Sequence, residues 1–176
     1  MRWLIFCFGL FLIAALSSPA PTRPIAAQEH TYTSPKVNYT VDFPSATWKL
    51  IGEPDDLHQH AEFVYGDRTE GYLRIRKEQL GDGLLVKDFA LRDQDEKVRF
   101  LPGYIMEGKL EDFKGRLSGY AASYEYTQAG KPMGGRTYYL QADASTVYAL
   151  RFTGMRDKLS RIRNQTDLIA RSFKLK

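Results

Sequence analysis

The sequence predicts an α+β fold in which one antiparallel β-sheet is flanked by helices, as an α/β/α sandwich. Three observations lead to this prediction. Apolar and polar residues alternate over much of the chain, as they do in half-buried strands. The joints between these segments are short and rich in turn residues, which indicates antiparallel neighbours, because parallel strands need long crossovers. Two segments instead have the apolar spacing of amphipathic helices, which pack on such a sheet.

The first 27 residues are typical of a secretory signal peptide and its cleavage region. Arg2 precedes an apolar run of 14 residues, and small residues then give candidate cleavage sites after Ala20 and Ala27. A membrane-spanning helix needs about 20 apolar residues, so we expect no stable membrane span after cleavage. Residues 28–176 are predicted to form a single domain that is exported to a periplasm or to the outside of the cell.

Strands dominate the first part of the exported chain. Val37, Tyr39, Val41 and Phe43 alternate with polar residues, and Pro44 ends this strand. The other strands predicted before the first helix cover residues 48–51, 61–65 and 71–78. Turn residues between the last two of these indicate a hairpin.

The segment from 85 to 99 has helical spacing instead. Leu85 and Phe89 are four residues apart, as are Val86 and Ala90, so one side of the helix is apolar. The other side is charged and is expected to face solvent; it carries Arg92, Asp93, Asp95 and Glu96.

A meander of strands follows this helix. The predicted strands cover about 104–113, 117–128, 136–142 and 146–153. The stretch Gly130–Arg136 is rich in Gly and is predicted to be a hairpin loop. It lacks the spacing of a phosphate-binding P-loop and precedes a strand rather than a helix, so a phosphate site is not expected there.

The C-terminal segment is the clearest helix. Its apolar stripe follows spacings of three and four and comprises Met155, Leu159, Ile162, Thr166, Ile169 and Phe173. We expect this stripe to lie across the sheet. Residues 156–176 hold seven basic and two acidic residues, whereas the whole chain carries a net charge of +4. A basic helix can face nucleic acid, anionic lipid or an acidic partner. Cations near a helix C-terminus are also favoured by the helix dipole, so we predict a solvated face here, and export argues against a nucleic-acid partner.

The order of these elements resembles the PsbP-like superfamily, which comprises the extrinsic photosystem protein and its non-photosynthetic bacterial relatives. The resemblance rests on a first strand that ends in Phe43-Pro44 and is followed by Trp48, a helix after the first strands, and the Gly-rich hairpin at Gly130–Arg136. It continues through the segments Thr137–Leu140, Val147–Phe152 and Ile169–Lys174, and covers about Tyr32 to Lys176. The resemblance implies a sheet between helices and a non-catalytic role in binding or assembly. No binding residue carries over.

One cluster of residues suggests a metal site. Asp56, His58, His60 and Glu62 are each two residues apart, and in an extended strand such residues share one face. Imidazoles and carboxylates are good ligands for zinc and other divalent ions. The alternative is a polar loop that enters a strand with solvated side chains. A divalent metal is therefore the one cofactor considered, and otherwise none is expected.

A set of tyrosines suggests a ligand pocket. Tyr120, Tyr124 and Tyr126 share a strand face, and Tyr148 lies on a neighbouring predicted strand. Stacked aromatic rings can form the floor of a pocket for an apolar or cyclic ligand. The same rings can equally be cross-strand packing beneath a helix.

The sequence limits the chemistry of the exported domain. Cys7 is the only cysteine and lies within the signal peptide, so disulfides, thiol nucleophiles and thiolate metal ligands are excluded. No nucleophile-elbow motif occurs, and all three histidines precede residue 61. We therefore expect an exported, non-enzymatic domain that binds a protein partner or a small ligand. The alternative is an envelope metal-binding protein or metal-dependent enzyme that uses the cluster around Asp56.

Overall fold

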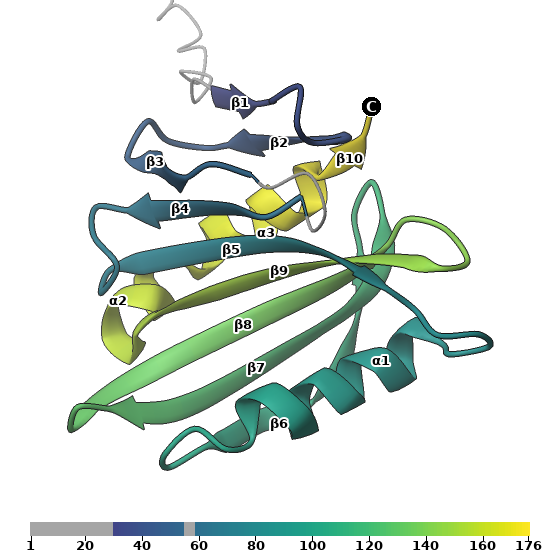
Figure 1. Cartoon of the computed structure of the whole chain (residues 1–176). Helices are drawn as coiled ribbons and strands as arrows, with labels where there is room; N and C mark the ends of the chain where they lie inside the picture. Colours follow the sequence, from purple (N-terminus) through teal and green to yellow (C-terminus); the bar gives the residue numbers. More distant parts are fainter. Residues whose placement is uncertain (1–29, 55–58) are drawn as a thin grey trace, which may run out of the picture.

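The computed structural model describes residues 30–54 and 59–176, which form two antiparallel sheets and several helices (Figure 1). The large sheet has seven strands in the order β3-β4-β5-β9-β8-β7-β6. These strands are β3 (Trp48–Gly52), β4 (Ala61–Tyr65), β5 (Gly71–Gln79), β6 (Ile105–Lys114), β7 (Ser118–Gln128), β8 (Lys131–Gln141) and β9 (Thr146–Met155). The small sheet has the order β1-β2-β10 and comprises β1 (His30–Tyr32), β2 (Tyr39–Phe43) and β10 (Lys174–Leu175).

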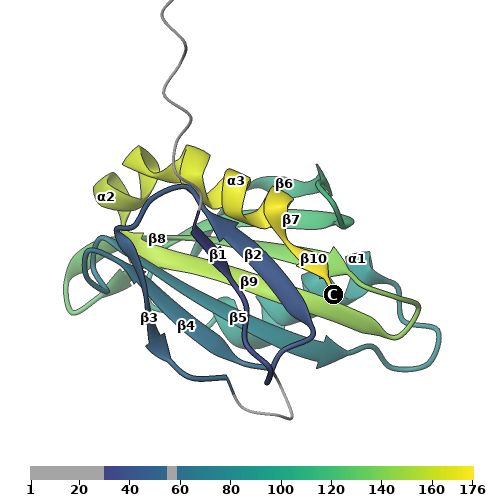
Figure 2. The same ribbon diagram turned by 90° about the horizontal axis from the view of Figure 1, so that it is seen from above.

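Helices cover both faces of the large sheet. Helix α1 (Val86–Asp93) continues into the π-helical turn η1 (Gln94–Val98) on one face, and α2 (Arg156–Arg161) and α3 (Arg163–Ser172) lie end to end on the other (Figures 1 and 2). This arrangement confirms the predicted α/β/α layers. The predicted signal peptide lies outside the described residues, and none of the described helices is long and apolar enough to cross a membrane.

The main core lies between the large sheet and the layer of α2, α3 and β2. Tyr138 and Phe152 of the sheet, Ile169 of α3 and Tyr39 of β2 are all fully buried there. The ring of Phe173, at the end of α3, packs at 4.8 Å from the ring of Tyr39. The strand predicted at 37–43 therefore belongs to the small sheet, because its apolar side covers α3 and its edge pairs with β10.

The opposite face of the large sheet holds two smaller apolar clusters. Val86 and Ala90 of α1 pack on Ala122, Tyr139 and Ala149 of the sheet. The second cluster, next to η1, contains Val98, Tyr124, Tyr126 and Met133. Helix α1 therefore covers the β7–β8 side of this face, and it does so with Val86 and Ala90 of its predicted apolar side.

The predicted C-terminal helix is divided in two. Ile162 leaves the helical conformation, with φ −103° and ψ 11°, and separates α2 from α3. Leu159, Ile162, Thr166, Ile169 and Phe173 are buried as predicted. Met155 was wrongly assigned to this stripe, because it belongs to β9 and packs with the aromatic cluster on the opposite face.

The hairpin predicted at Gly130–Arg136 is confirmed, but its loop is much shorter than predicted. Strand β8 begins at Lys131, which pairs with Gln128, so the turn is only Ala129-Gly130. Both turn residues have positive φ, 49° and 74°, as in the tight turns that match the twist of a β-hairpin. The remaining glycines are inside the strand.

Gly134 and Gly135 have different reasons to lie in β8. The ring of Tyr124 lies over Gly135, and a Cβ atom added to Gly135 would be 2.1 Å from that ring. Tyr124 has little freedom to move, because it is buried between Tyr104 and Tyr126. At Gly134 an added Cβ would meet only ordinary contacts of 3.5 Å, one of them with Leu159 of α2.

The two neighbouring glycines give a matched pair of substitutions. We expect Gly135→Ala to lower the free energy of unfolding by about 1–3 kcal/mol, because the methyl group overpacks the site under Tyr124. Gly134→Ala should be neutral or should stabilise by up to about 1 kcal/mol, since its site has room and the unfolded chain loses freedom. Urea unfolding of both variants tests this, and equal losses would contradict it.

Candidate functional site

The face of the sheet that carries α1 is only partly covered, and basic side chains line its open part. On β5, Gly71, Leu73 and Ile75 are buried, whereas the alternate residues are half-buried and lie on the α1 side. We call this surface the arginine face; it comprises Arg68, Arg74, Arg76, Lys97 and Arg151, which come from β5, β9, η1 and the turn before β5.

Strand register brings these residues together. Arg74 of β5 pairs with Glu62 of β4 on one side and with Arg151 of β9 on the other. Directly paired residues on neighbouring strands point to the same face, about 5 Å apart at Cβ. Arg76 pairs with Ala149, whose small side chain leaves space beside it.

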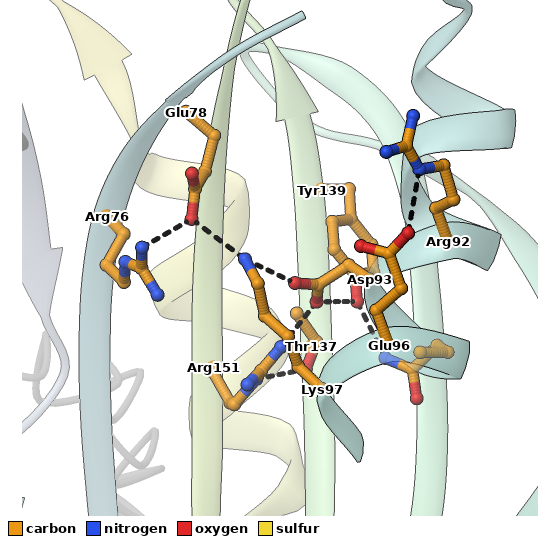
Figure 3. Close-up of polar contacts among 10 residues, drawn as sticks. Arg76, Glu78, Arg92, Asp93, Glu96, Lys97, Thr137, Tyr139 and Arg151 are labelled. Carbon is orange, nitrogen blue, oxygen red and sulfur yellow. Dashed lines mark hydrogen bonds and ion pairs between the residues drawn. The ribbon is translucent and has the colours of Figure 1, made fainter. Parts of the chain in front are cut away.

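Asp93 is the buried acid at the centre of the site (Figure 3). It ends α1 and is only 4% exposed. Its carboxylate accepts a hydrogen bond of 2.7 Å from the Tyr139 hydroxyl, and it forms ion pairs with Arg151 and with Lys97, the latter at 3.0 Å. Asp93 therefore ties α1 and η1 to β8 and β9.

The π-helical turn places the next residues on the same side as Asp93. The amide of Arg99 donates to the carbonyl of Gln94 at 2.8 Å, which is the long i→i+5 bond of a π-turn. Gln94 is buried, and its side-chain amide donates to the Tyr139 hydroxyl at 2.6 Å. The Tyr139 hydroxyl thus accepts a hydrogen bond from Gln94 and donates one to Asp93.

These contacts fix the protonation states in the cluster. Burial alone would raise the pKa of Asp93, but Arg151, the Tyr139 hydroxyl and Lys97 together hold it below its ordinary value of 3.8. Burial, with the nearby charge of Asp93, raises the pKa of Tyr139 well above 10.0. At neutral pH the site therefore holds an ionised carboxylate and a neutral phenol, and the carboxylate is fully engaged in bonds within the protein.

The chain of ion pairs continues from Asp93 to the edge of the arginine face. Lys97 lies 3.5 Å from Glu78, and Glu78 lies 2.9 Å from Arg76 (Figure 3). Acidic and basic side chains thus alternate from Arg76 to Arg151. Such a network fixes the direction of long side chains that would otherwise be mobile.

Glu62 is the acid at the other end of the arginine face, next to Arg68 and Arg74. Arg74 and Arg68 lie 3.1 Å and 3.4 Å from its carboxylate oxygens. The guanidinium groups of both arginines also lie near the Tyr72 ring, at 4.8 Å for Arg68 and 5.8 Å for Arg74. Burial would raise the pKa of Glu62, but the Tyr72 hydroxyl and Arg74 lower it.

The acids of this face are covered and the cations are exposed. The side chains of Glu62, Glu78 and Asp93 are 18%, 17% and 4% exposed. The side chains of Arg68, Arg74 and Arg76 are 63%, 42% and 32% exposed. The surface in contact with solvent is therefore positive, although each cation has an acidic partner beneath it.

Asp93 does not lie on the solvent side of α1, where its position in the helix predicts it. The helical period assigned it to the solvent side of α1 together with Arg92, whereas it faces the sheet. The reason is that a partner 58 residues away, Arg151, compensates its burial. The alternation of Arg74 and Arg76 with buried residues was a signal for an exposed row, but the register that brings Arg151 beside it cannot be read locally.

The predicted metal cluster is only partly described. Asp56 and His58 lie outside the described residues. His60 Nε2 lies 3.3 Å from Glu62, whose carboxylate is also engaged by Arg74. No group of three or more potential ligands forms a metal site within residues 30–54 and 59–176. Metal binding by the four residues stays a prediction.

The four tyrosines of the predicted pocket do not share one surface. Tyr120, Tyr124 and Tyr126 lie on the α1 face, where they take part in its two apolar clusters. Tyr148 lies on the opposite face, and its ring packs 5.0 Å from that of Phe173. Ligand binding by the first three tyrosines stays a prediction, whereas the contacts of Tyr148 are those of the main core.

The basic C-terminal segment makes internal contacts. Arg156 forms an ion pair with Glu125 at 2.9 Å, and Lys158 with Glu70 at 3.2 Å. The Lys176 ammonium donates to the carbonyls of Ser34 and Val37 at 2.6 and 2.8 Å. Its positive charges are therefore largely used to fix α2, α3 and the chain end on the sheets.

Comparison with known proteins supports the fold. No family model matches the sequence, and no curated protein matches it. Among solved structures, LpqN, involved in cell envelope biogenesis of Mycobacterium tuberculosis, has a TM-score of 0.59 at 17% identity and covers 84% of this chain and 90% of its own. Cyanobacterial PsbP (CyanoP) from Synechocystis sp. PCC 6803 has a TM-score of 0.56 at 13% identity and covers 92% and 99%.

A third similar structure is the Ran-binding protein Mog1p of Saccharomyces cerevisiae, with a TM-score of 0.60 at 8% identity over 85% of this chain and 96% of that protein. The chain has the fold of PsbP. The resemblance noted from the sequence is thus confirmed at the level of the fold, and identities this low carry no residue of function across.

Asp93 and Arg151 allow a test of the network by pH. We expect Asp93→Asn to lower the free energy of unfolding by about 2 kcal/mol at pH 7, because it leaves a mostly buried Arg151 without its anion. Since folding lowers the pKa of Asp93, its contribution is full above its ordinary pKa of 3.8 and is lost as the pH falls through the folded-state value. The difference between wild type and variant should therefore shrink on acidification below about pH 4.

Urea unfolding at several pH values measures this difference. Asp95→Asn is the control, because Asp95 lies in the same turn but is exposed. A difference between wild type and Asp93→Asn that stays constant with pH would contradict the assignment.

Proposed function

We propose that this chain is an exported, non-enzymatic binding domain whose arginine face docks an acidic segment of a protein partner. The observation that carries the proposal is the layering of charge on this face, in which Glu62, Glu78 and Asp93 are covered and the arginines project. A positive surface attracts an acidic partner and repels a basic one. The fold of CyanoP and LpqN is compatible with a role in binding or assembly.

The arginine face is suited to binding more than to catalysis. Its one deeply buried acid, Asp93, is kept ionised and is bonded to Tyr139, Arg151 and Lys97, so near pH 7 it has no proton to donate, and its lowered pKa makes it a weak base. Arg74 and Arg68 flank the ring of Tyr72, which gives an acidic segment both a planar apolar contact and bidentate donors. The buried acids hold the guanidinium groups in place, so a partner loses less entropy in ordering them.

Export is the second part of the proposal. It is supported by the charge, apolar core and small residues of positions 1–27. The absence of cysteine beyond Cys7 is compatible with an oxidising compartment, where the core and the ion-pair network supply stability without disulfides. The partner is then a protein of the periplasm or of the cell exterior.

The docking surface can be tested with defined peptides. We expect a fluorescent peptide rich in Asp and Glu to bind the protein more tightly than a neutral or basic peptide of the same length. Binding should weaken as salt rises from about 0.05 to 0.3 M, because exposed charges are screened. Arg74→Gln combined with Arg76→Gln should weaken binding about tenfold, measured by fluorescence anisotropy.

The matched control removes two charges elsewhere. Lys109→Gln combined with Arg116→Gln has the same net charge as the test variant, but both sites are exposed at the far edge, on β6 and in the turn after it. Equal losses of peptide affinity in the two double variants would show that binding depends on net charge alone, and would rule out a docking role for the arginine face.

Export can be tested on the full chain. Expressed with a C-terminal tag in a bacterial host, the protein should be recovered outside the cytoplasm with an N-terminus at Pro21 or Gln28. Leu12→Arg, which places a charge in the apolar run, should block export and cleavage, whereas Arg23→Gln outside that run should not. Recovery of an intact Met1 in the wild-type product would contradict the signal-peptide assignment.

A further inference from the structure

A cavity of about 110 Å³ opens on the other side of the sheet, between α2, α3 and strands β6–β8. It lies on the face opposite the arginine face, because Ser123 pairs with Arg136, and Arg136 pairs with Phe152 of the main core. The cavity is thus independent of the proposed docking surface. None of the residues that line it forms the ion pairs or hydrogen bonds of Asp93.

The floor of the cavity is buried and exists because a side chain is missing. Gly134 has no Cβ to fill the space beneath Leu159, and both residues line the cavity. Gly134 is not forced to be glycine by its backbone, since an added Cβ would make only ordinary contacts. The buried Thr166 of α3 completes this part of the lining.

The polar wall carries hydrogen-bond donors. Arg136 is buried, and its guanidinium donates to the Tyr138 hydroxyl at 2.8 Å, to Ser123 Oγ at 2.6 Å and to Glu111 at 3.3 Å. A guanidinium has five N–H groups, so donors are left over. Ser123 accepts from Arg136 through its oxygen, which leaves the hydroxyl hydrogen available to a ligand.

The rim of the cavity carries charges of both signs, Glu107 on one side and Arg163 on the other. Glu107 lies beside a like charge, Glu125, and partial burial together with that neighbour raises the pKa of Glu107. Glu125 already has a cation, Arg156, at 2.9 Å. Arg163 and Arg156 act in the opposite direction and lower the pKa of Glu107, so Glu107 and Arg163 attract each other across the mouth of the cavity.

We propose that this cavity binds a small zwitterion that carries an ammonium and a carboxylate group, such as a free amino acid. The ammonium would lie at Glu107 and relieve its repulsion with Glu125. The carboxylate would lie at Arg163 and the spare donors of Arg136 and Ser123. A simple cation would meet Arg156 and Arg163, and a simple anion would meet Glu107, whereas a zwitterion can pair with charges of both signs.

The size of the cavity sets an upper limit on the ligand. Sites for drug-sized ligands occupy about 300–1,000 Å³. The volume of about 110 Å³ instead fits a few heavy atoms beyond the two charged groups. Glycine, alanine and β-alanine are therefore the appropriate probes, and larger side chains would have to project past the rim into solvent.

The test is a titration of the purified ¹⁵N-labelled protein, followed by the amide NMR signals of Gly134 and Ser123. Glycine, alanine and β-alanine are added separately, with acetate and methylammonium as ligands of one charge each. At least one amino acid should give saturable shifts. Acetate and methylammonium should each bind at least tenfold more weakly than that amino acid, or give no shifts. Equal binding of acetate or of methylammonium would overturn the proposal, as would no saturation with any of the three amino acids.

Variants connect the signal to the cavity. Glu107→Gln and Arg163→Gln should each weaken binding at least tenfold, and Gly134→Ala should weaken it by filling the floor without disturbing the fold. Arg161→Gln is the control, because Arg161 is 77% exposed and does not line the cavity. Affinity unchanged in both Glu107→Gln and Arg163→Gln would also overturn the proposal.

Discussion

The ion pair between Asp93 and Arg151 determines what the α1 face of the sheet can do. It fixes the end of α1 above β9, so that the helix and its π-helical turn cover β7 and β8 and leave β4 and β5 open. Because Asp93 also holds Tyr139 and Lys97, one buried carboxylate sets the position of a helix, a strand and the cations at the edge of the open surface. A buried acid is costly on its own, and this one persists because three donors surround it.

The two glycines of β8 are the second constraint, and they act on opposite faces. Gly135 gives room to the ring of Tyr124 on the α1 face, while Gly134 leaves space beneath Leu159 on the α2 face. A side chain at Gly135 would collide with the Tyr124 ring, whereas a methyl group at Gly134 would fit and would fill the floor of the cavity. The aromatic packing beside η1 and the cavity beside α2 therefore depend on adjacent positions of one strand.

Local patterns in the sequence were sufficient to predict most of the elements, and long-range pairing was where they failed. Alternation placed the strands of the large sheet, and helical spacing placed α1 with η1 and the stripe of α3. The Gly-rich stretch before Arg136 has the composition of a loop, but it lies within a strand, because Tyr124 requires a glycine inside β8. Met155 fitted the helical spacing by coincidence, since it ends β9 on the other face.

The functional residues were harder to predict than the elements for the same physical reason. Arg74 and Arg76 alternate with buried residues and are recognisable as an exposed row, but their importance depends on Arg151, which only the pairing of β5 with β9 brings beside them. Asp93 has the local features of a solvated helix residue. Tyr148 and Ala149 are neighbours on β9 and therefore lie on opposite faces of the sheet. The face on which Tyr148 lies depends on how β9 pairs with its neighbours and not on composition.

The two faces of the sheet layer their charges in opposite ways, and this difference separates their ligands. On the α1 face the acid is inside: the Asp93 side chain is 4% exposed and that of its partner Arg151 is 26% exposed. On the α2 face the base is inside: the Arg136 side chain is 11% exposed, and its partners Glu111 and Asp167 are 58% and 34% exposed. The carboxylates around Arg136 are local, because the exposed basic side chains of α2, among them Arg156 and Arg161, lie on the same side of the sheet. The arginine face is therefore open to a macromolecule, whereas the buried donors of Arg136 are accessible only to a ligand that is small enough to enter the cavity and can pair with the charges of both signs on its rim.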